Sequence, residues 1–375
     1  MHMADALLSP AVGLAMNAVS AAAIGVSAAT VSKDKFPEKK VPVIGVAGAL
    51  VFAAQMINFT IPGTGSSGHI GGGILLSGLL GGVPAFLAIS AVLIIQCLFF
   101  ADGGLLALGC NIFNLGVIPC IAVYPLIFKP IMKGGAGASR LSAASLISAV
   151  AALQAGALCV VAQTSLSGIA ALPFAVFAGL MLPIHLAIGL VEGIVTAAVL
   201  SFIWKVRPDI IDSEGAGAVN KRKVLKPVRI VFAAAALATG GALSLFASAN
   251  PDGLEWAVLK TALRSTGSRA EPEAGGDIHE KAAEIQDITA FLPGYAFKSD
   301  PDSAAGTSLS GVIGAAITFT VAGASGLAIS KLKRGKKARI KNRDDEGGVG
   351  AAADSGDGSG TDSGGGVGAG VSRDA

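Results

Sequence analysis

The feature that most constrains the fold of this chain is a series of long apolar runs that contain almost no charged residues. A run of about 20 apolar residues is long enough to cross the hydrocarbon core of a bilayer as an α-helix. Hydrophobic residues make up 52% of the chain and charged residues only 14%, far fewer charges than a soluble domain carries. The runs therefore predict an all-α, polytopic membrane protein embedded in a lipid bilayer.

These runs divide the chain into two membrane units. A Gly-rich run at 70–82 is too short to span alone, and we interpret it as a half-helix that protein must bury. With this run counted, residues 1–211 are predicted to form a seven-helix bundle, and residues 227–332 a two-helix C-terminal membrane unit. The predicted full spans are residues 4–31, 41–61, 83–100, 104–132, 141–163, 173–204, 228–249 and 309–329.

Hydrophilic segments connect and end these units. Residues 212–226 are predicted to be a cytoplasmic linker, and residues 250–303 a loop between the last two spans. Residues 333–375 form a tail that is basic at first and then rich in Gly, Ser and Asp, a composition typical of disorder.

The distribution of Lys and Arg predicts the orientation of the chain, because cytoplasmic loops carry an excess of these residues. Here they occupy alternate loops, while the other loops are neutral or acidic. This pattern places the N-terminus, the loop with His69 and residues 250–303 outside the cytoplasmic (inner) membrane, and the C-terminus in the cytoplasm. The basic residues in these loops are Lys33, Lys35, Lys39, Lys40, Lys129, Lys133, Arg140, Lys205, Arg207, Lys221, Arg222 and Lys223.

The first two residues are able to chelate a metal ion. The amine of Met1, the amide nitrogen of His2 and the imidazole Nδ1 of His2 are joined by short covalent chains, so together they close five- and six-membered rings on one ion. A further imidazole would complete a square-planar set of nitrogens, which suits Ni²⁺ or Cu²⁺ and is accepted by Co²⁺. His69, at the end of "GTGSSGH", is the natural fourth ligand. Alternatively, His2 is a solvated terminal residue and His69 an interfacial one.

Two ionisable residues lie inside the span 173–204. His185 and Glu192 are seven residues apart on one helical face. Ionisable residues inside a membrane are candidates for function. We favour slightly the alternative that they are a buried hydrogen-bonding pair that fixes helix packing.

The remaining polar candidates surround the predicted site. Asp5 is a candidate for orienting the terminus around an ion. Asn58, Asn111 and Asn114 lie inside predicted spans, where they line the site or bond between helices, and we expect the second role for at least two of them. The four cysteines are expected to be small packing residues rather than ligands: Cys97, Cys110, Cys120 and Cys159.

A different class of function competes with metal binding. "GSSGH" at 65–69 resembles the sequence around the nucleophile of rhomboid-type intramembrane serine proteases, with Ser67 as nucleophile and His185 as its base. The zinc-protease pattern His-Glu-x-x-His is absent. The phosphate-binding Walker A pattern is absent too, so ATP-driven transport would need a separate ATPase. We expect neither an organic cofactor nor a nucleic-acid partner.

Several motifs together resemble one family of membrane proteins. The chain begins "MHMADALLSPAV" and continues with "GTGSSGHIGGGILLSGLLG", "QCLFFADGGLLALGCNIFNLGVIP" and "HLAIGLVEGIVTA". These stretches are similar to the signatures of the CbiM/NikM substrate-binding components of energy-coupling-factor transporters for cobalt and nickel. The second unit, with "NPDGLEWAVLK" and "FLPGYAF", resembles the small NikN-like, PDGLE-type component, so the chain looks like a fusion of the two.

The resemblance implies a function, partners and ligands. It implies uptake of Co²⁺ or Ni²⁺ as the transported substrate, with Met1, His2 and His69 as ligands. It also implies a CbiQ/NikQ-like transmembrane coupling subunit and a CbiO/NikO-like ATPase. Ala6 stands where the family usually has Gly, which should loosen the turn behind the ligands.

Capture of Co²⁺ or Ni²⁺ for uptake is thus the leading hypothesis, without catalysis by this chain. We expect residues 250–303 to help loading rather than to form a second metal site, since His279 stands alone there. The protease is the first alternative, and an assembly subunit without a site of its own is the second. The residues do not choose between the two metals, although square-planar geometry and the NikN-like unit both favour nickel.

Overall fold

The structure is a computed structural model that describes residues 1–33, 41–135, 137–211, 225–267, 275–301 and 303–324. The chain divides into a unit of residues 1–330 and a unit of residues 331–375. All of the described residues belong to the first unit. The predicted tail 333–375 and most of the predicted linker 212–226 lie outside the described residues.

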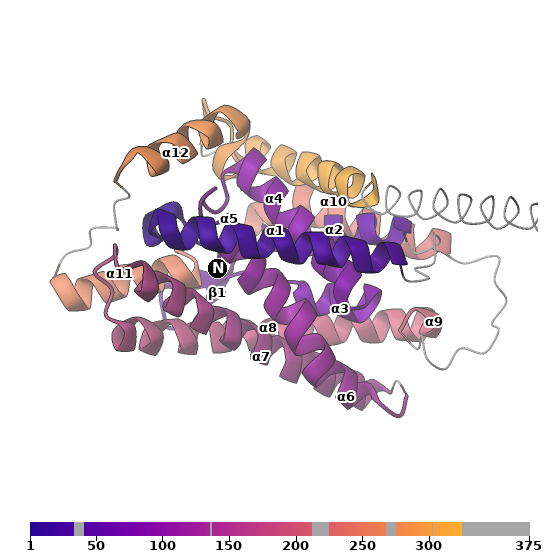
Figure 1. Cartoon of the computed structure of the whole chain (residues 1–375). Helices are drawn as coiled ribbons and strands as arrows, with labels where there is room; N and C mark the ends of the chain where they lie inside the picture. The colour runs from indigo at the N-terminus through magenta and orange to yellow at the C-terminus, as the bar shows by residue number, and fades with distance from the viewer. Residues whose placement is uncertain (34–40, 136, 212–224, 268–274, 302, 325–375) are drawn as a thin grey trace, which may run out of the picture. The chain divides into compact units, whose positions relative to one another are not determined.

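The first 211 residues form the helices of the predicted bundle (Figure 1). The short 3₁₀ helix η1 (Asp5–Leu7) precedes the first long helix. The helices are then α1 (Pro10–Lys33), α2 (Val41–Gln55), α3 (Gly73–Leu80), α4 (Gly82–Phe100), α5 (Leu108–Ile112), η3 (Phe113–Phe128), α6 (Lys129–Met132), α7 (Ala138–Ser167), α8 (Phe174–Val206) and α9 (Pro208–Ile211).

One of these helices is wound irregularly. Residues Leu108–Met132 form one continuous apolar helix whose middle part, η3, is a π-helix. Pro119 and Pro125 lie inside η3 and lack the backbone N–H that regular α-helical bonding requires. The irregularity is thus built into the sequence.

The C-terminal part adds two apolar helices and a hydrophilic segment between them. The elements are α10 (Leu225–Gly241), η4 (Leu243–Phe246), α11 (Gly253–Thr266), α12 (Asp277–Thr289), η5 (Pro293–Tyr295) and a last helix, Ala304–Ala324. The last helix packs closely on α10, because a Cβ atom on Gly311 would overlap the backbone of Gly240. Close backbone approach at small residues is how helices commonly pack in lipid.

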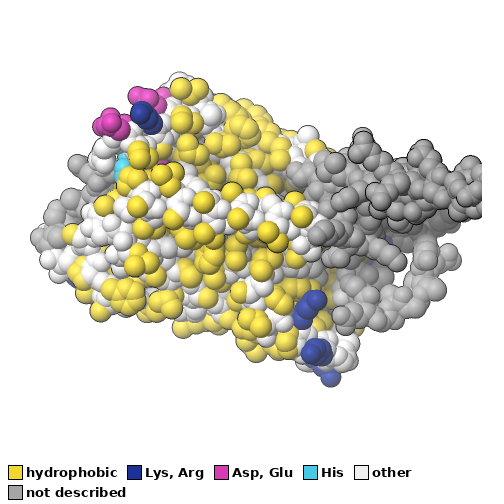
Figure 2. All heavy atoms as spheres, in the orientation of Figure 1, with side chains coloured by type: hydrophobic (Ala, Val, Ile, Leu, Met, Phe, Trp, Pro, Cys, Tyr) yellow, Lys and Arg dark blue, Asp and Glu magenta, His cyan; other side chains and the backbone are white. Residues whose placement is uncertain are grey.

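The helices suit a membrane. Among the described residues, six helices are long and apolar enough to cross a bilayer, and α2 and α10 contain shorter apolar stretches. Large apolar side chains point outward, among them Ile194 at 64% exposure and Phe202 at 53%. Figure 2 shows hydrophobic side chains across much of one face, with Lys and Arg at the end formed by α6, and both acidic and basic side chains near α12. The expectation of an all-α polytopic membrane protein is confirmed.

The structure corrects the predicted spans at three places. The run 228–249 was expected to be one span, but α10 ends at Gly241 and the short 3₁₀ helix η4 follows it. The first run was expected to be helical from residue 4, but α1 begins at Pro10 and the chain before it forms only η1. The run 41–61 was expected to be one span, but α2 ends at Gln55 and an antiparallel hairpin follows, β1 (Phe59–Ile61) and β2 (Ser66–Gly68). Gly63 and Gly65 have positive φ in the turn between these strands, which explains the change from helix to hairpin. The short Gly-rich run does form a short, largely buried helix, α3, as predicted.

The segment 250–303 is also more ordered than its hydrophilic composition indicates. It contains α11 and α12, and both pack on the first membrane unit. His279 at the start of α12 bonds through Nε2 to the carbonyl oxygen of Leu8 at 2.9 Å, and Gln286 donates to the carbonyl of Gly103 at 2.7 Å. This segment therefore lies directly over the N-terminus of the chain.

Candidate metal site

The N-terminal residues are held in place by backbone and side-chain hydrogen bonds. The backbone N–H of Met3 donates to Oδ1 of Asn111 at 2.7 Å, and the Asn111 amide donates to the carbonyl of Met3 at 3.2 Å. Asp5 accepts from the backbone N–H of Ala107 at 2.8 Å. A Cβ atom on Gly104 would overlap the Asp5 carboxylate, so glycine is required there. These contacts fix the first residues against the start of α5.

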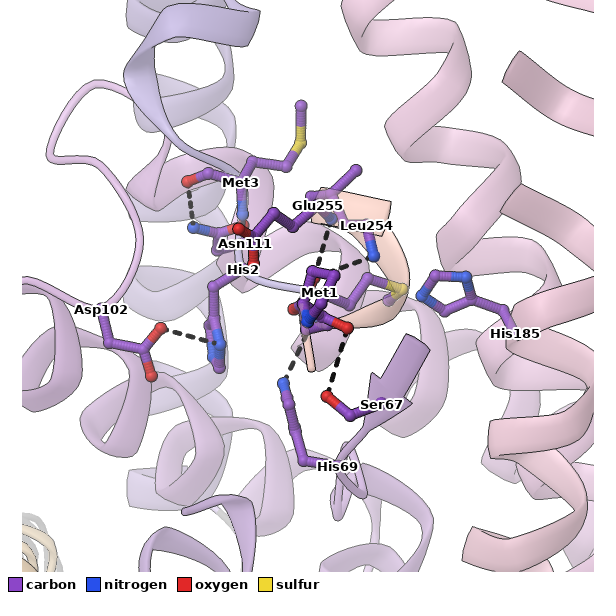
Figure 3. Close-up of polar contacts among 12 residues, drawn as sticks. Met1, His2, Met3, Ser67, His69, Asp102, Asn111, His185, Leu254 and Glu255 are labelled. Carbon is purple, nitrogen blue, oxygen red and sulfur yellow. Dashed lines mark hydrogen bonds and ion pairs between the residues drawn. The ribbon is translucent and has the colours of Figure 1, made fainter. Parts of the chain in front are cut away.

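The terminal amine of Met1 lies between a histidine and a carboxylate (Figure 3). It is 3.1 Å from Nε2 of His69 and 2.8 Å from Oδ2 of Asp252, which precedes α11. The Met1 side of this ion pair is 3% exposed and the Asp252 side chain is 21% exposed. Burial alone would raise the pKa of Asp252, but the neighbouring terminal ammonium and His69 hold it below its ordinary value.

His69 presents a lone pair to that amine. Its Nδ1 lies 3.1 Å from the carbonyl oxygen of Ile70, so Nδ1 carries the proton that this bond needs and Nε2 is left as an acceptor. Burial lowers the pKa of His69 to about 3, helped by the positive terminal ammonium. The imidazole is therefore neutral at physiological pH, and a metal ion would use the Nε2 lone pair that now faces the amine.

His2 stacks on His69. Their ring centroids are 5.1 Å apart and the planes are inclined by 12°. Nδ1 of His2 lies 3.2 Å from Oδ1 of Asp102, and Tyr295 donates its hydroxyl to Oδ2 of the same carboxylate at 2.6 Å. Nε2 of His2 is buried and has no hydrogen-bond partner among the described residues. Burial lowers the pKa of His2 as well, which outweighs the attraction of Asp102 for a proton.

The hairpin that carries His69 is fixed by the C-terminal part of the chain. The backbone N–H of Ser67 donates to the carbonyl of Pro251 at 2.8 Å, and its hydroxyl donates to the carbonyl of Asn250 at 2.8 Å. The indole N–H of Trp256 donates to the carbonyl of Thr64 at 3.0 Å. As a result, the turn before α11 is hydrogen-bonded to the hairpin and lies beside the amine of Met1.

The predicted candidates inside α8 lie near the site but are not paired with each other. His185 donates from Nδ1 to the carbonyl of Met181 at 2.8 Å, and its Nε2 has no partner among the described residues. Glu192 accepts from the backbone N–H groups of Gly71 and Gly72, at 2.7 and 3.0 Å. It therefore holds the turn that follows His69. His185 instead lines a small cavity together with Met1, His69, Gly71, Ile188 and Gly253.

The three asparagines have three different environments, so the expectation that at least two bond between helices is wrong. Asn114 does bond between helices, with Gln163 of α7 at 2.8 and 3.1 Å. Asn111 instead holds Met3. Asn58 lies after the end of α2, outside any helix, and its Oδ1 is buried without a partner among the described residues. The hairpin at 59–68 displaced it from the predicted span.

The cysteines and Ala6 can be compared with what was expected of them. The four cysteines are free, and three of them are buried in the packed interior. Ala6 lies inside η1 and has no positive φ, and the backbone bonds Leu7 N–H to Ala4 O and Leu8 N–H to Asp5 O close its turn. The alanine therefore imposes no left-handed strain, and the loosening of the turn stays a prediction.

The protease alternative finds no support in the structure. Ser67 lies in β2, and its hydroxyl donates to the carbonyl of Asn250 rather than to a histidine. The imidazole of His185 is bonded to its own helix at Met181. The two residues thus lack the nucleophile–base contact that this chemistry uses.

The residues missed in the sequence are carboxylates and a phenol from distant segments. Asp252 is recognisable as the N-cap of α11 because Asp-Gly-Leu-Glu has the spacing of a capping box. That pattern gives no indication of the amine beside it. Asp102 and Tyr295 lie inside the longer motifs "QCLFFADGGLLALGCNIFNLGVIP" and "FLPGYAF". Their contact with His2 depends on the tertiary fold.

The donor atoms here are unusual for a metal site. Among the described residues, no group of three or more His, Cys, Asp or Glu side chains is arranged to hold a metal ion. A site at Met1, His2 and His69 would instead take its ligands from two imidazoles, the amine and a backbone amide. Such a nitrogen set favours late divalent ions such as Ni²⁺ and Co²⁺ over Mg²⁺ or Ca²⁺.

Two family models and several known proteins match this chain. The family model described as "Cobalt uptake substrate-specific transmembrane region" (CbiM) matches residues 2–210, and the model described as "PDGLE domain" matches residues 226–331. The fused nickel transport protein NikMN of Rhodobacter capsulatus is 28% identical over 352 residues, covering 87% of this chain and 97% of that protein. The cobalt transport protein CbiM of Sorangium cellulosum is 31% identical over 175 residues, covering 46% and 76%. A crystal structure of a transition metal transporter, 29% identical, covers 55% of this chain and 93% of its own, with a TM-score of 0.49.

Proposed function

The chain belongs to the CbiM family of cobalt-uptake transmembrane proteins and carries a PDGLE domain, and we propose that it captures Co²⁺ or Ni²⁺ through Met1, His2 and His69. The resemblance to CbiM/NikM components fused to a NikN-like unit is confirmed. The chain is a multi-pass membrane protein of a cobalt and nickel transport family, not an enzyme of its own. The ligands, the energy source and the partners are proposals.

The observation that carries the proposed site is the distance from the terminal amine to His69. Two nitrogen ligands at about 2.0–2.1 Å from one ion, at right angles to each other, are about 2.8–3.0 Å apart. The Met1 nitrogen and Nε2 of His69 are 3.1 Å apart. An ion that replaces the shared proton would thus find these two ligands already spaced as neighbours in a square plane.

His2 would complete the square plane with its amide nitrogen and Nδ1. Nδ1 now contacts Asp102, so the imidazole must turn away from this carboxylate to join the chelate. Among the described residues, the buried Nε2 of His2 has no hydrogen-bond partner, which supports the proposal that the ring changes its contacts when the ion binds. Capture is therefore a local rearrangement of the first two residues around a preplaced His69.

We further propose that uptake is driven by partners. The chain has no Walker A pattern, so a separate CbiO/NikO-like subunit would hydrolyse ATP. A CbiQ/NikQ-like coupling subunit would transmit the resulting conformational change to this chain. The site would open to the outside of the cytoplasmic membrane, as the Lys and Arg distribution predicts. Release would follow when the ATPase cycle shifts the complex.

The test is to separate the amine from the imidazole. A Met-Ala insertion before His2, in full-length protein whose retained Met1 is confirmed by intact mass, should abolish tight binding of Ni²⁺ and Co²⁺ in calorimetry. Substituting His2→Ala or His69→Ala should do the same, and uptake with both partners co-expressed should fall in parallel. Undiminished affinity after the insertion would overturn the proposed site. Competition between Ni²⁺ and Co²⁺ in the same assay identifies the preferred ion.

A further inference from the structure

The PDGLE part of the chain supplies a carboxylate to the N-terminal amine. Asp252 and Met1 are 251 positions apart in sequence, yet Oδ2 and the amine nitrogen are 2.8 Å apart. We propose that Asp252 is a positioning residue of the metal site, which holds the amine beside His69 before the ion arrives and remains hydrogen-bonded to it afterwards. This inference rests on the proposed function and assigns a specific role to the C-terminal domain.

Asp252 is itself fixed in orientation. Its other oxygen, Oδ1, accepts the backbone N–H groups of Leu254 and Glu255 at 2.9 and 2.8 Å, as the N-cap of α11. The two oxygens therefore divide their tasks, since Oδ1 caps the helix and Oδ2 receives the amine. Rotation of the carboxylate to serve another partner would expose the helix N–H groups, so Oδ2 has little freedom to leave the amine.

The same turn is joined to the strand that carries His69. Pro251, next to Asp252, accepts the backbone N–H of Ser67 at 2.8 Å, and Ser67 is two positions before His69. A displacement of the hairpin would thus move Asp252 and His69 together. The amine is held between two groups that belong to one rigid frame, although they come from the two domains of the chain.

The contact with Asp252 is compatible with a bound ion. A primary amine that gives its lone pair to a metal keeps two N–H bonds, and one of them can still donate to Oδ2. The charge also matches. A terminal ammonium carries one positive charge, and a divalent ion bound to the deprotonated amide of His2 carries one net positive charge as well. Asp252 therefore serves as the counter-ion in both states, which a buried charge requires.

Two substitutions separate positioning from helix capping. Asp252→Asn and Asp252→Ser remove the charge but keep a side chain that caps helices well. If Asp252 positions the amine, both variants should bind Ni²⁺ about 10- to 100-fold more weakly than the wild type in calorimetry on the full-length protein. At saturating Ni²⁺ they should keep the d–d absorption band of the wild type, because all four nitrogens remain. Asp287→Asn is the matched control, since its ion pair with Lys298 at 3.0 Å lies on the surface, and it should bind as the wild type does.

The outcomes distinguish this inference from the proposed function. If Asp252→Ala weakens binding but the Asn and Ser variants bind as tightly as the wild type, Asp252 acts only as a cap and the inference is wrong. Binding as tight as in the wild type in all three variants would also overturn the inference. Tighter binding in all three would overturn it as well, and would show that Asp252 competes with the ion for the amine. If the Met-Ala insertion leaves affinity unchanged, the proposed site itself fails. If the insertion abolishes binding while the Asp252 variants are unaffected, only the present inference fails.

Discussion

The imidazole rings of His2 and His69 lie face to face, with centroids 5.1 Å apart. Burial lowers the pKa of both residues, that of His69 to about 3, so that two neutral rings are stacked near pH 7. An arriving ion therefore meets imidazole lone pairs rather than imidazolium protons. This relationship determines how capture should depend on pH.

We predict that acid weakens capture through the amine and the amide of the terminus, not through the imidazoles. Binding should release about two protons for each ion, one from the ammonium of Met1 and one from the backbone amide of His2. Near pH 7 the neutral form of both histidines is favoured, because burial lowers the pKa of His2 and lowers that of His69 to about 3. Calorimetry of Ni²⁺ binding in buffers with different ionisation enthalpies measures the protons released. A release of three or four protons near pH 7 would contradict neutral imidazoles in the empty site.

The turn behind His69 should depend on Glu192. Its carboxylate accepts two backbone N–H groups, those of Gly71 and Gly72, and Gly72 has a φ of 77° in the left-handed region. Glu192→Gln keeps the size of the side chain but only one acceptor oxygen, so one buried N–H loses its partner at a cost of about 1–3 kcal/mol. We expect a lower midpoint of thermal unfolding and weaker Ni²⁺ binding.

A matched control for that substitution is Glu284→Gln on the exposed face of α12. It should leave both the unfolding midpoint and the affinity unchanged. Should Glu192→Gln behave like this control, the bonds to Gly71 and Gly72 would not be what fixes His69.

Much of the architecture follows from the sequence, because lipid leaves few alternatives. An apolar run in a bilayer must satisfy its own backbone groups, so the positions of most helices could be read from their composition. The errors fall where glycine changes the backbone, as in the hairpin at 59–68, where Gly63 and Gly65 adopt positive φ. They also fall at the N-terminus, where residues before Pro10 are apolar but are held by Asn111 and Ala107 instead of extending α1.

The candidate site divides in the same way. Met1 and His2 could be proposed from covalent geometry alone, because their nitrogens are joined by short chains whatever the fold. His69 required the orientation of loops across the membrane. Asp252 and Tyr295 could not be predicted, since their patterns indicate a helix cap and a turn. Only the packing of the C-terminal segment over the N-terminus brings Asp252 to the amine of Met1. The same packing brings Tyr295 to Asp102, the carboxylate that contacts His2.

Ser67 should matter for the hairpin and not for chemistry. Ser67→Ala removes the hydroxyl bond to the carbonyl of Asn250 but keeps the backbone bond to Pro251. The expected loss is about 1 kcal/mol of unfolding free energy, the usual net contribution of one hydrogen bond. Ni²⁺ affinity should stay within a few-fold of the wild type. A peptidase activity of the purified protein that vanished in this variant would instead restore the serine-protease interpretation.

The contact of Asp102 with His2 should make Tyr295 important at a distance from the ligands. Tyr295 donates to Oδ2 of Asp102 at 2.6 Å, and burial raises its pKa, which keeps the hydroxyl protonated as a donor. Tyr295→Phe preserves the ring stacked on Phe100, with centroids 5.0 Å apart, and removes only the hydroxyl. The contact of His2 Nδ1 with Asp102 must break before this nitrogen joins the chelate, so weakening the contact should favour the ion. We expect an increase in Ni²⁺ affinity of about tenfold or less for Tyr295→Phe, and a larger increase for Asp102→Asn. Because the phenol acts through the carboxylate, Tyr295→Phe should have no further effect in the Asp102→Asn background. Calorimetry on the four proteins of this cycle provides the test. Additive changes in affinity would show that Tyr295 acts on the site by another route, and a loss of affinity in Asp102→Asn would contradict the turn of the His2 ring.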